Sequence, residues 1–155
     1  MHLLDHERVA SEVFRIASSA GAILMLGRVE RNPDSARERM AKEMNERLRQ
    51  RGFEPRRGER QNSKLLESCR RRGAIILEPV CIAKWNVSTS PQQSLDSWRR
   101  LSSLGGIQVP STTRAEILWE LSVWAEEMFG GLDEECESEE SYVLKPFSVP
   151  SSHTV

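Results

Sequence analysis

Hydrophobic residues recur in two different patterns within the first 26 positions of the chain. The first pattern is a stripe at steps of three and four, which places its members on one face of an α-helix: Val9, Val13, Ile16 and Ala17. Asp5 precedes this stripe and can cap the helix, because its carboxylate accepts hydrogen bonds from unpaired amides of the first turn. Residues 22–26 then form a continuous apolar run between Gly21 and Gly27. Such a run is typical of a strand buried on both faces, as in a parallel sheet. Helix, turn and strand are half of an α/β winding unit.

Helical spacing continues downstream and predicts four more helices. They cover residues 35–51, 63–72, 91–104 and a last segment that ends at Phe129. Residues with side chains suited to N-capping precede three of them: Asp34 or Ser35, then Ser90, then Ser111, Thr112 or Thr113. The first of these helices carries a narrow apolar stripe of Met40, Met44 and Leu48, and helical spacing favours core packing for the methionines over a ligand-facing role.

Three runs downstream of residue 73 predict β-strands. Residues 74–77 and 80–85 are β-type runs separated by Pro79, which cannot donate to a ladder and so marks a bulge or an edge. Residues 141–149 alternate as a terminal strand does. Residues 150–155 are expected to form a disordered tail.

Length and composition place the chain among soluble, single-domain proteins. It has 155 residues and a formal net charge of −1, and no apolar run approaches the roughly 18 residues of a membrane span. The first residues carry no secretory signal pattern. The three cysteines lie far apart, which favours a reduced, cytoplasmic protein over a disulfide framework. The three histidines do not cluster with the cysteines, so no metal site is expected.

Charge is segregated along the chain. Residues 51–72 hold eight Arg or Lys and three Glu, whereas residues 116–144 hold ten carboxylates and no Arg or Lys. The basic segment can hold phosphates or can simply end a helix with favourable charges. It lacks interleaved aromatics and any nucleic-acid module signature, so a nucleic-acid partner is not expected. The acidic and basic segments either face each other or are solvated.

The N-terminal stretch resembles part of the class I S-adenosylmethionine-dependent methyltransferases. In that family an "HH-apolar-x-D" turn follows the fourth strand, then come a helix of the form "v-x-E-v-x-R-v", the words "L-x-P-G-G" and the fifth strand. The matching residues here are His2, Leu3, Leu4 and Asp5, then Val9, Glu12, Val13, Arg15 and Ile16, then Gly21 and residues 22–26. Where the family has a proline and two glycines, this chain has Ser18, Ser19, Ala20 and Gly21.

The resemblance extends to residue 149. Residues 88–131 are similar to the helical, cap-like insertion that covers the substrate in many members, through Trp98, Ser102, Ser103, Leu104 and Gly106, then Trp124, Ala125, Phe129, Gly130, Leu132 and Asp133. The resemblance implies an α/β, partial Rossmann-like fold of about three strands, one parallel-type and a C-terminal antiparallel pair, with flanking helices. The last strand is then expected antiparallel beside the strand at 22–26.

The resemblance also implies candidate residues for the acceptor pocket. His2 and His6 lie in the turn that borders the cofactor and acceptor in the family, and Trp85 ends a strand where an aromatic often lines the pocket. Trp98 belongs to the cap-like insertion. The alternatives remain a surface turn for the histidines and core packing for the tryptophans. No catalytic residue can be assigned.

The family's cofactor fingerprint, a strand ending in "D/E-x-G-x-G-x-G", has no counterpart in the chain, and its two Gly-Gly pairs follow predicted helices. The resemblance therefore implies the C-terminal half of a methyltransferase domain, residues 1–149. S-adenosylmethionine is the implied cofactor, but this chain alone is not expected to bind it or to be active. Expected partners are a small-molecule acceptor and, through the exposed strand edge, a separate N-terminal half or a second copy. A non-catalytic interaction module stays open.

Overall fold

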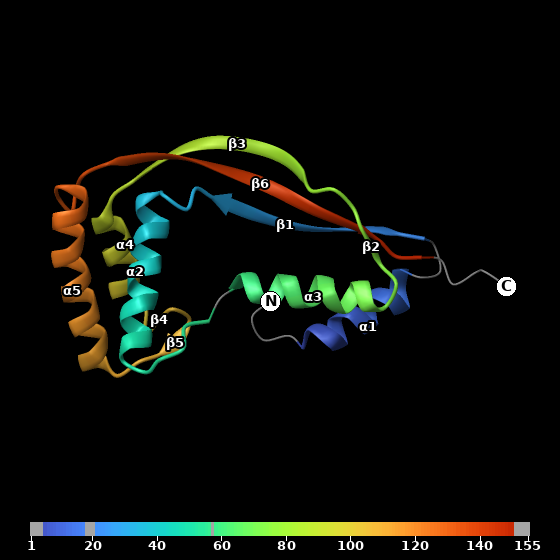
Figure 1. Ribbon diagram of the computed structural model, residues 1–155, viewed down its shortest axis with the longest axis horizontal. Helices are drawn as coiled ribbons and strands as arrows, with labels where there is room; N and C mark the ends of the chain where they lie inside the picture. The colour runs from blue at the N-terminus through green and yellow to red at the C-terminus, as the bar shows by residue number, and fades with distance from the viewer. Residues whose placement is uncertain (1–4, 18–20, 57, 151–155) are drawn as a thin grey trace. The chain divides into compact units, whose positions relative to one another are not determined.

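The computed structural model describes residues 5–17, 21–56 and 58–150, apart from the side chains of residues 58–61, and is a mixed α/β structure (Figure 1). The chain divides into two compact units: unit 1 takes residues 1–30, 57–84 and 141–155, and unit 2 takes residues 31–56 and 85–140. The elements in chain order are α1 (His6–Ala17), β1 (Ile23–Arg31), α2 (Ala36–Gln50), α3 (Gly58–Arg71), β2 (Ile75–Ile76), β3 (Val80–Thr89), α4 (Pro91–Arg99), β4 (Ser103–Leu104), β5 (Ile107–Gln108), α5 (Ser111–Phe129) and β6 (Cys136–Ser148).

The C-terminal strand lies in the interior of an antiparallel sheet. The strand order is β1–β6–β2, and β3 also pairs with β6. Ile75 lies opposite Ser148 and Ile76 opposite Phe147, which fixes the antiparallel register of β2. The strand near the N-terminus is therefore the neighbour of the last strand, as expected, and it stands at the end of the described strand order.

The prediction that residues 22–26 are buried on both faces is wrong. Ile23 and Met25 are 59% and 60% exposed, whereas Leu24 and Leu26 pack against the core of unit 1. That core brings together α1, α3 and the end of β6 through Ala10, Ala17, Leu65, Cys69, Ala74, Phe147 and Val149. Helices α1 and α3 pack side by side on one face (Figure 1). Because the described residues of unit 1 cover only that face, odd-numbered apolar side chains of β1 remain exposed.

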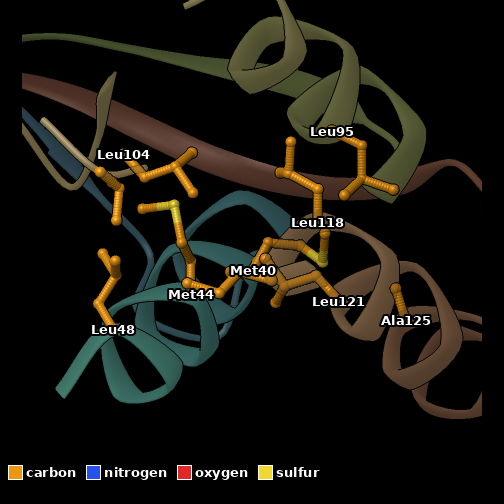
Figure 2. Packing of buried hydrophobic residues seen from close by; sticks show 10 residues of the cluster. Met40, Met44, Leu48, Leu95, Leu104, Leu118, Leu121 and Ala125 are labelled. Carbon is orange, nitrogen blue, oxygen red and sulfur yellow. The ribbon is translucent and has the colours of Figure 1, made fainter. Parts of the chain in front are cut away.

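Unit 2 has a core of its own between three helices. Met40, Met44 and Leu48 of α2 are buried, which confirms the predicted stripe. Figure 2 shows Met40 beside Leu118 and Leu121 of α5, and Met44 and Leu48 directed toward Leu104 of β4 (Ser103–Leu104). The other buried members of the cluster are Leu95, Leu104, Val109, Ile117, Leu118, Leu121 and Ala125.

The predicted start of α4 is confirmed, but its predicted end is wrong. Ser90 accepts a hydrogen bond from the Gln93 amide at 3.3 Å and forms a capping box, with Pro91 in the first turn. The helix ends at Arg99, and residues 103–108 form the hairpin β4–β5. Gly105 and Gly106 turn it with φ of 56° and 75°, and two positive φ values are what a type I′ hairpin turn requires.

Several further boundaries differ from expectation: α3 begins at Gly58 rather than at residue 63, and β1 and β3 extend past their predicted ends to Arg31 and Thr89. Helix α5 begins after Pro110 with no side-chain cap, so the predicted cap by Ser111, Thr112 or Thr113 is wrong. Strand β6 begins at Cys136, within the acidic segment, rather than at residue 141 as predicted. Within the strand, the Glu140 carboxylate is paired with Arg31, whose Nε lies 3.0 Å from Glu140 Oε1. This ion pair offsets the cost of burying the Glu140 side chain, which is only 12% exposed.

Candidate functional site

The structure places three of the four sequence-predicted pocket residues, and they lie in different settings. His6 opens α1 in unit 1 and is partly buried. Trp85 lies in β3 and Trp98 in α4, both in unit 2 and both partly buried. Trp98 packs against the core of unit 2, so its ring contributes to packing. His2 lies outside the described residues. A pocket role for these residues stays a prediction.

A groove of about 370 Å³ runs along α1 in unit 1. Its walls are almost wholly apolar, and its lining is Val9, Val13, Ile16, Ala17 and Leu24, with Asp5, Arg8 and Glu12. Asp5 is fixed as the helix cap because its Oδ1 accepts from the Glu7 amide at 3.0 Å, as predicted. Ile16 is 66% exposed, so the predicted apolar stripe is only partly buried. A groove of this chemistry is suited to apolar side chains, and its lining includes the whole predicted stripe of Val9, Val13, Ile16 and Ala17.

A second, more polar hollow of about 470 Å³ lies on α4 in unit 2, lined by Gln93, Asp96, Ser97, Arg100 and Leu101. Asp96 already accepts hydrogen bonds from Gln92 Nε2 at 2.8 Å and from Arg99 Nη1 at 2.9 Å. The carboxylate is therefore engaged by its own helix. The hollow offers hydrogen-bonding groups but no paired acid and base.

An ion network joins α2 to α5 within unit 2. Glu120 accepts hydrogen bonds from Arg51 and from Arg47 Nη1, the latter at 2.8 Å, and Arg47 Nη2 lies 2.9 Å from Glu43. Partial burial raises the pKa of the Glu120 carboxyl, but the hydrogen bonds and charges of Arg47 and Arg51 outweigh it and lower the pKa overall. The network holds two helices together and leaves no free acid for catalysis. Sequence spacing gave no signal for it, because the partners are about 70 residues apart.

A smaller network links α1 to the end of α3 in unit 1. Arg71 Nη2 lies 2.5 Å and Arg72 Nη2 3.4 Å from the carboxylate of Glu7. The nearby Ser68 hydroxyl makes the largest contribution to the lowered pKa of the Glu7 carboxyl, although the Ser68 oxygen has no partner within ordinary hydrogen-bond limits among the described residues. Arg71 and Arg72 lower this pKa further. Part of the basic segment is thus neutralised by its own chain.

The described residues include scattered potential metal ligands, two Gly-Gly pairs and the buried thiol of Cys69. No group of three His, Cys, Asp or Glu residues among them could hold a metal ion. The Gly-Gly pairs serve as turn and helix end: Gly105 and Gly106 turn the hairpin, and Gly130 ends α5 at a φ of 82°. Burial raises the pKa of the Cys69 thiol, which keeps it protonated and unreactive.

Two comparisons bear on the identity of the chain. No family model matches the sequence, and no curated protein matches it. Within the described residues, no helix combines the length and the apolar character needed to cross a membrane.

Proposed function

We propose that the chain is the C-terminal half of a class I S-adenosylmethionine-dependent methyltransferase and needs a glycine-rich half to bind the cofactor. The observation that carries this proposal is the position of the last strand. β6 lies between β1 and β2, beside the strand that follows the "HH-apolar-x-D" helix, and the sheet is antiparallel. This is the placement that the resemblance implies for the last strand, in a partial Rossmann-like fold.

The helices of unit 2 give a second line of support. Helices α4 and α5 fall between β3 and β6 in the chain, where the resemblance places a cap-like insertion. Their shared core with α2 makes this segment a packed element rather than a loop. In the proposed enzyme, this segment of unit 2, with Trp98 of α4, would cover a small-molecule acceptor.

The described residues argue against cofactor binding by this chain alone. A phosphate- or nucleoside-binding glycine loop brings several backbone amides to the ligand after a strand. Here the Gly-Gly pairs form a hairpin turn and a helix end instead. The glycine-rich half would have to supply most contacts to S-adenosylmethionine, and this chain would complete the sheet and cover the acceptor.

Calorimetric titration with S-adenosylmethionine is the first test. The chain alone is expected to show no saturable binding, and a low-micromolar affinity would overturn the proposal of a half enzyme. The second arm uses the DNA upstream of the Met1 codon, where a reading frame for "D/E-x-G-x-G-x-G" is expected. The polypeptide that it encodes, mixed with this chain, should bind the cofactor. The same polypeptide with its motif glycines changed to alanine is the control and should not.

The alternative of a non-catalytic module that uses opposed charged faces has less support. Glu120 and Glu140 of the acidic segment are paired with arginines of unit 2, and Arg71 and Arg72 of the basic segment are paired with Glu7. These internal pairs reduce the charge left for a partner. The alternative requires partner binding that weakens steeply with salt, so salt-independent association would count against it.

A further inference from the structure

Helix α5 of unit 2 is apolar on two opposite faces. Its inner face packs against α2 and α4 through the buried side chains of Ile117, Leu121 and Ala125 (Figure 1). Its outer face carries Trp119 and Val123, which are 68% and 41% exposed. The outer face of a surface helix is normally polar, and a helix that is apolar on both faces is normally enclosed on both. The described residues leave the outer apolar face of α5 without a cover.

The outer apolar residues of α5 form a ridge that is suited to packing against another helix. Ala115, Trp119 and Val123 follow one another at steps of four, and all three are exposed. Ridges with this spacing fit the grooves of a second helix. Beside the ridge, the Ser122 hydroxyl donates to the Trp119 carbonyl at 2.6 Å, so it is turned toward the backbone of its own helix. Tryptophan is enriched among the residues that dominate binding energy at protein interfaces, which makes Trp119 the natural anchor of the ridge.

Three carboxylates border the ridge, one near its start and two at its end: Glu116, Glu126 and Glu127. Residues three and four positions apart are neighbours on a helix surface, which places Glu116 beside Trp119 and the other two beside Val123. All three are exposed, and their carboxylates form no ion pair with any residue in the described part of the chain. Since residues 116–144 contain no Lys or Arg, the charge that α5 places at the ridge is negative.

We propose that the outer ridge of α5 is the docking site for a basic amphipathic helix of a partner protein. The apolar face of that helix covers Trp119 and Val123, and its Lys or Arg side chains meet the three carboxylates. The sign of the charge selects this partner, because nucleic acids and anionic membranes are repelled by carboxylates. A second copy that presents the same face, as a two-fold axis requires, opposes three carboxylates to three, and like charges across an interface are disfavoured. This inference does not depend on methyl transfer.

Binding of a synthetic helical peptide, made of leucine and lysine with one apolar face, tests the proposal. Fluorescence anisotropy of the labelled peptide with the full chain is expected to show saturable, micromolar binding that weakens as salt is raised. Trp119→Ser should weaken this binding about tenfold to thirtyfold, whereas Trp119→Phe keeps an aromatic ring and should retain most of it. Leu101→Ser, at a side chain 49% exposed elsewhere on unit 2, is the control and should have no effect. Circular dichroism checks that each variant folds.

Removal of the bordering charges tests the electrostatic part of the proposal. The triple variant Glu116→Gln, Glu126→Gln, Glu127→Gln should bind the peptide about tenfold more weakly at low salt and lose most of the salt dependence. The matched control Asp133→Asn, Glu134→Gln, Glu137→Gln removes the same charge from exposed positions of the acidic segment outside α5, and it should bind as the wild type does.

Three results would overturn the proposal. One is the absence of saturable binding, or binding that is indifferent to Trp119→Ser. Another is an equal effect of the two triple variants, because position on α5 would then not matter. The third is a dimer of the chain alone that sedimentation velocity detects and that Trp119→Ser abolishes, because a second copy would then cover the ridge.

Discussion

Replacing Gly105 by alanine tests whether the Gly-Gly pair is a packed hairpin turn. Gly105 has a φ of 56°, which costs an L-residue about 1–2 kcal/mol. A Cβ there would lie 2.8 Å from Pro55 Cβ, 2.9 Å from Leu48 Cδ1 and 3.0 Å from Asn45 Oδ1. Overpacking of a close-packed site costs about 1–3 kcal/mol more. The loss of unfolding free energy is therefore expected to be about 2–5 kcal/mol.

Gly130→Ala is the matched control. Gly130 also has a positive φ, of 82°, but a Cβ there would meet no heavy atom within 4 Å. Its loss should be the backbone cost alone, about 1–2 kcal/mol. Urea denaturation followed by tryptophan fluorescence measures both, since Trp98 and Trp124 pack against the core of unit 2. Equal losses in the two variants would refute the argument that packing around Gly105 fixes the hairpin.

Three further predictions concern the cores and the ion network. Leu121→Ala in the core of unit 2 should lower the unfolding free energy by about 2–5 kcal/mol in urea titrations, whereas Val123→Ala, at a side chain 41% exposed, should change it little; similar losses would contradict the assigned core. Glu120→Gln should cost about 1 kcal/mol at neutral pH. Because the folded pKa of Glu120 is lowered from 4.5, the ion network's contribution is present above that value and lost as the pH falls through the lowered pKa; thermal melts of wild type and variant should therefore converge in acid, and a constant gap would refute this. The exposed Cys81 should react with iodoacetamide well before the buried Cys69, as followed by mass spectrometry; the reverse order would contradict their placement.

Local periodicity anticipated most helices of this chain. The stripe of Met40, Met44 and Leu48 defined α2, and the Ser90–Pro91 pair defined the start of α4, because spacing and capping act within a few residues. The end of α4 was missed because Leu101 and Leu104 continue the helical spacing. Leu101 is in fact 49% exposed, whereas Leu104 is buried but belongs to strand β4 of the hairpin.

Features that depend on distant partners could not be read from the sequence. The apolar run at 22–26 predicted a strand but not that Ile23 and Met25 stay exposed, because that depends on which face α1 and α3 cover. The acidic start of β6 has no apolar alternation, and its pairing relies on other strands and on Arg31. The sequence pattern identified the apolar residues of α1 that line the groove, but it did not show that Ile16 stays exposed to solvent.

Binding of S-adenosylmethionine by the reconstituted pair tests the central claim most directly. This chain and the glycine-rich polypeptide encoded upstream of its Met1 codon would be titrated with the cofactor separately and then as a mixture. Saturable heat is expected only from the mixture. Cofactor binding by this chain alone, or a mixture that remains silent, would contradict its assignment as the second half of a methyltransferase.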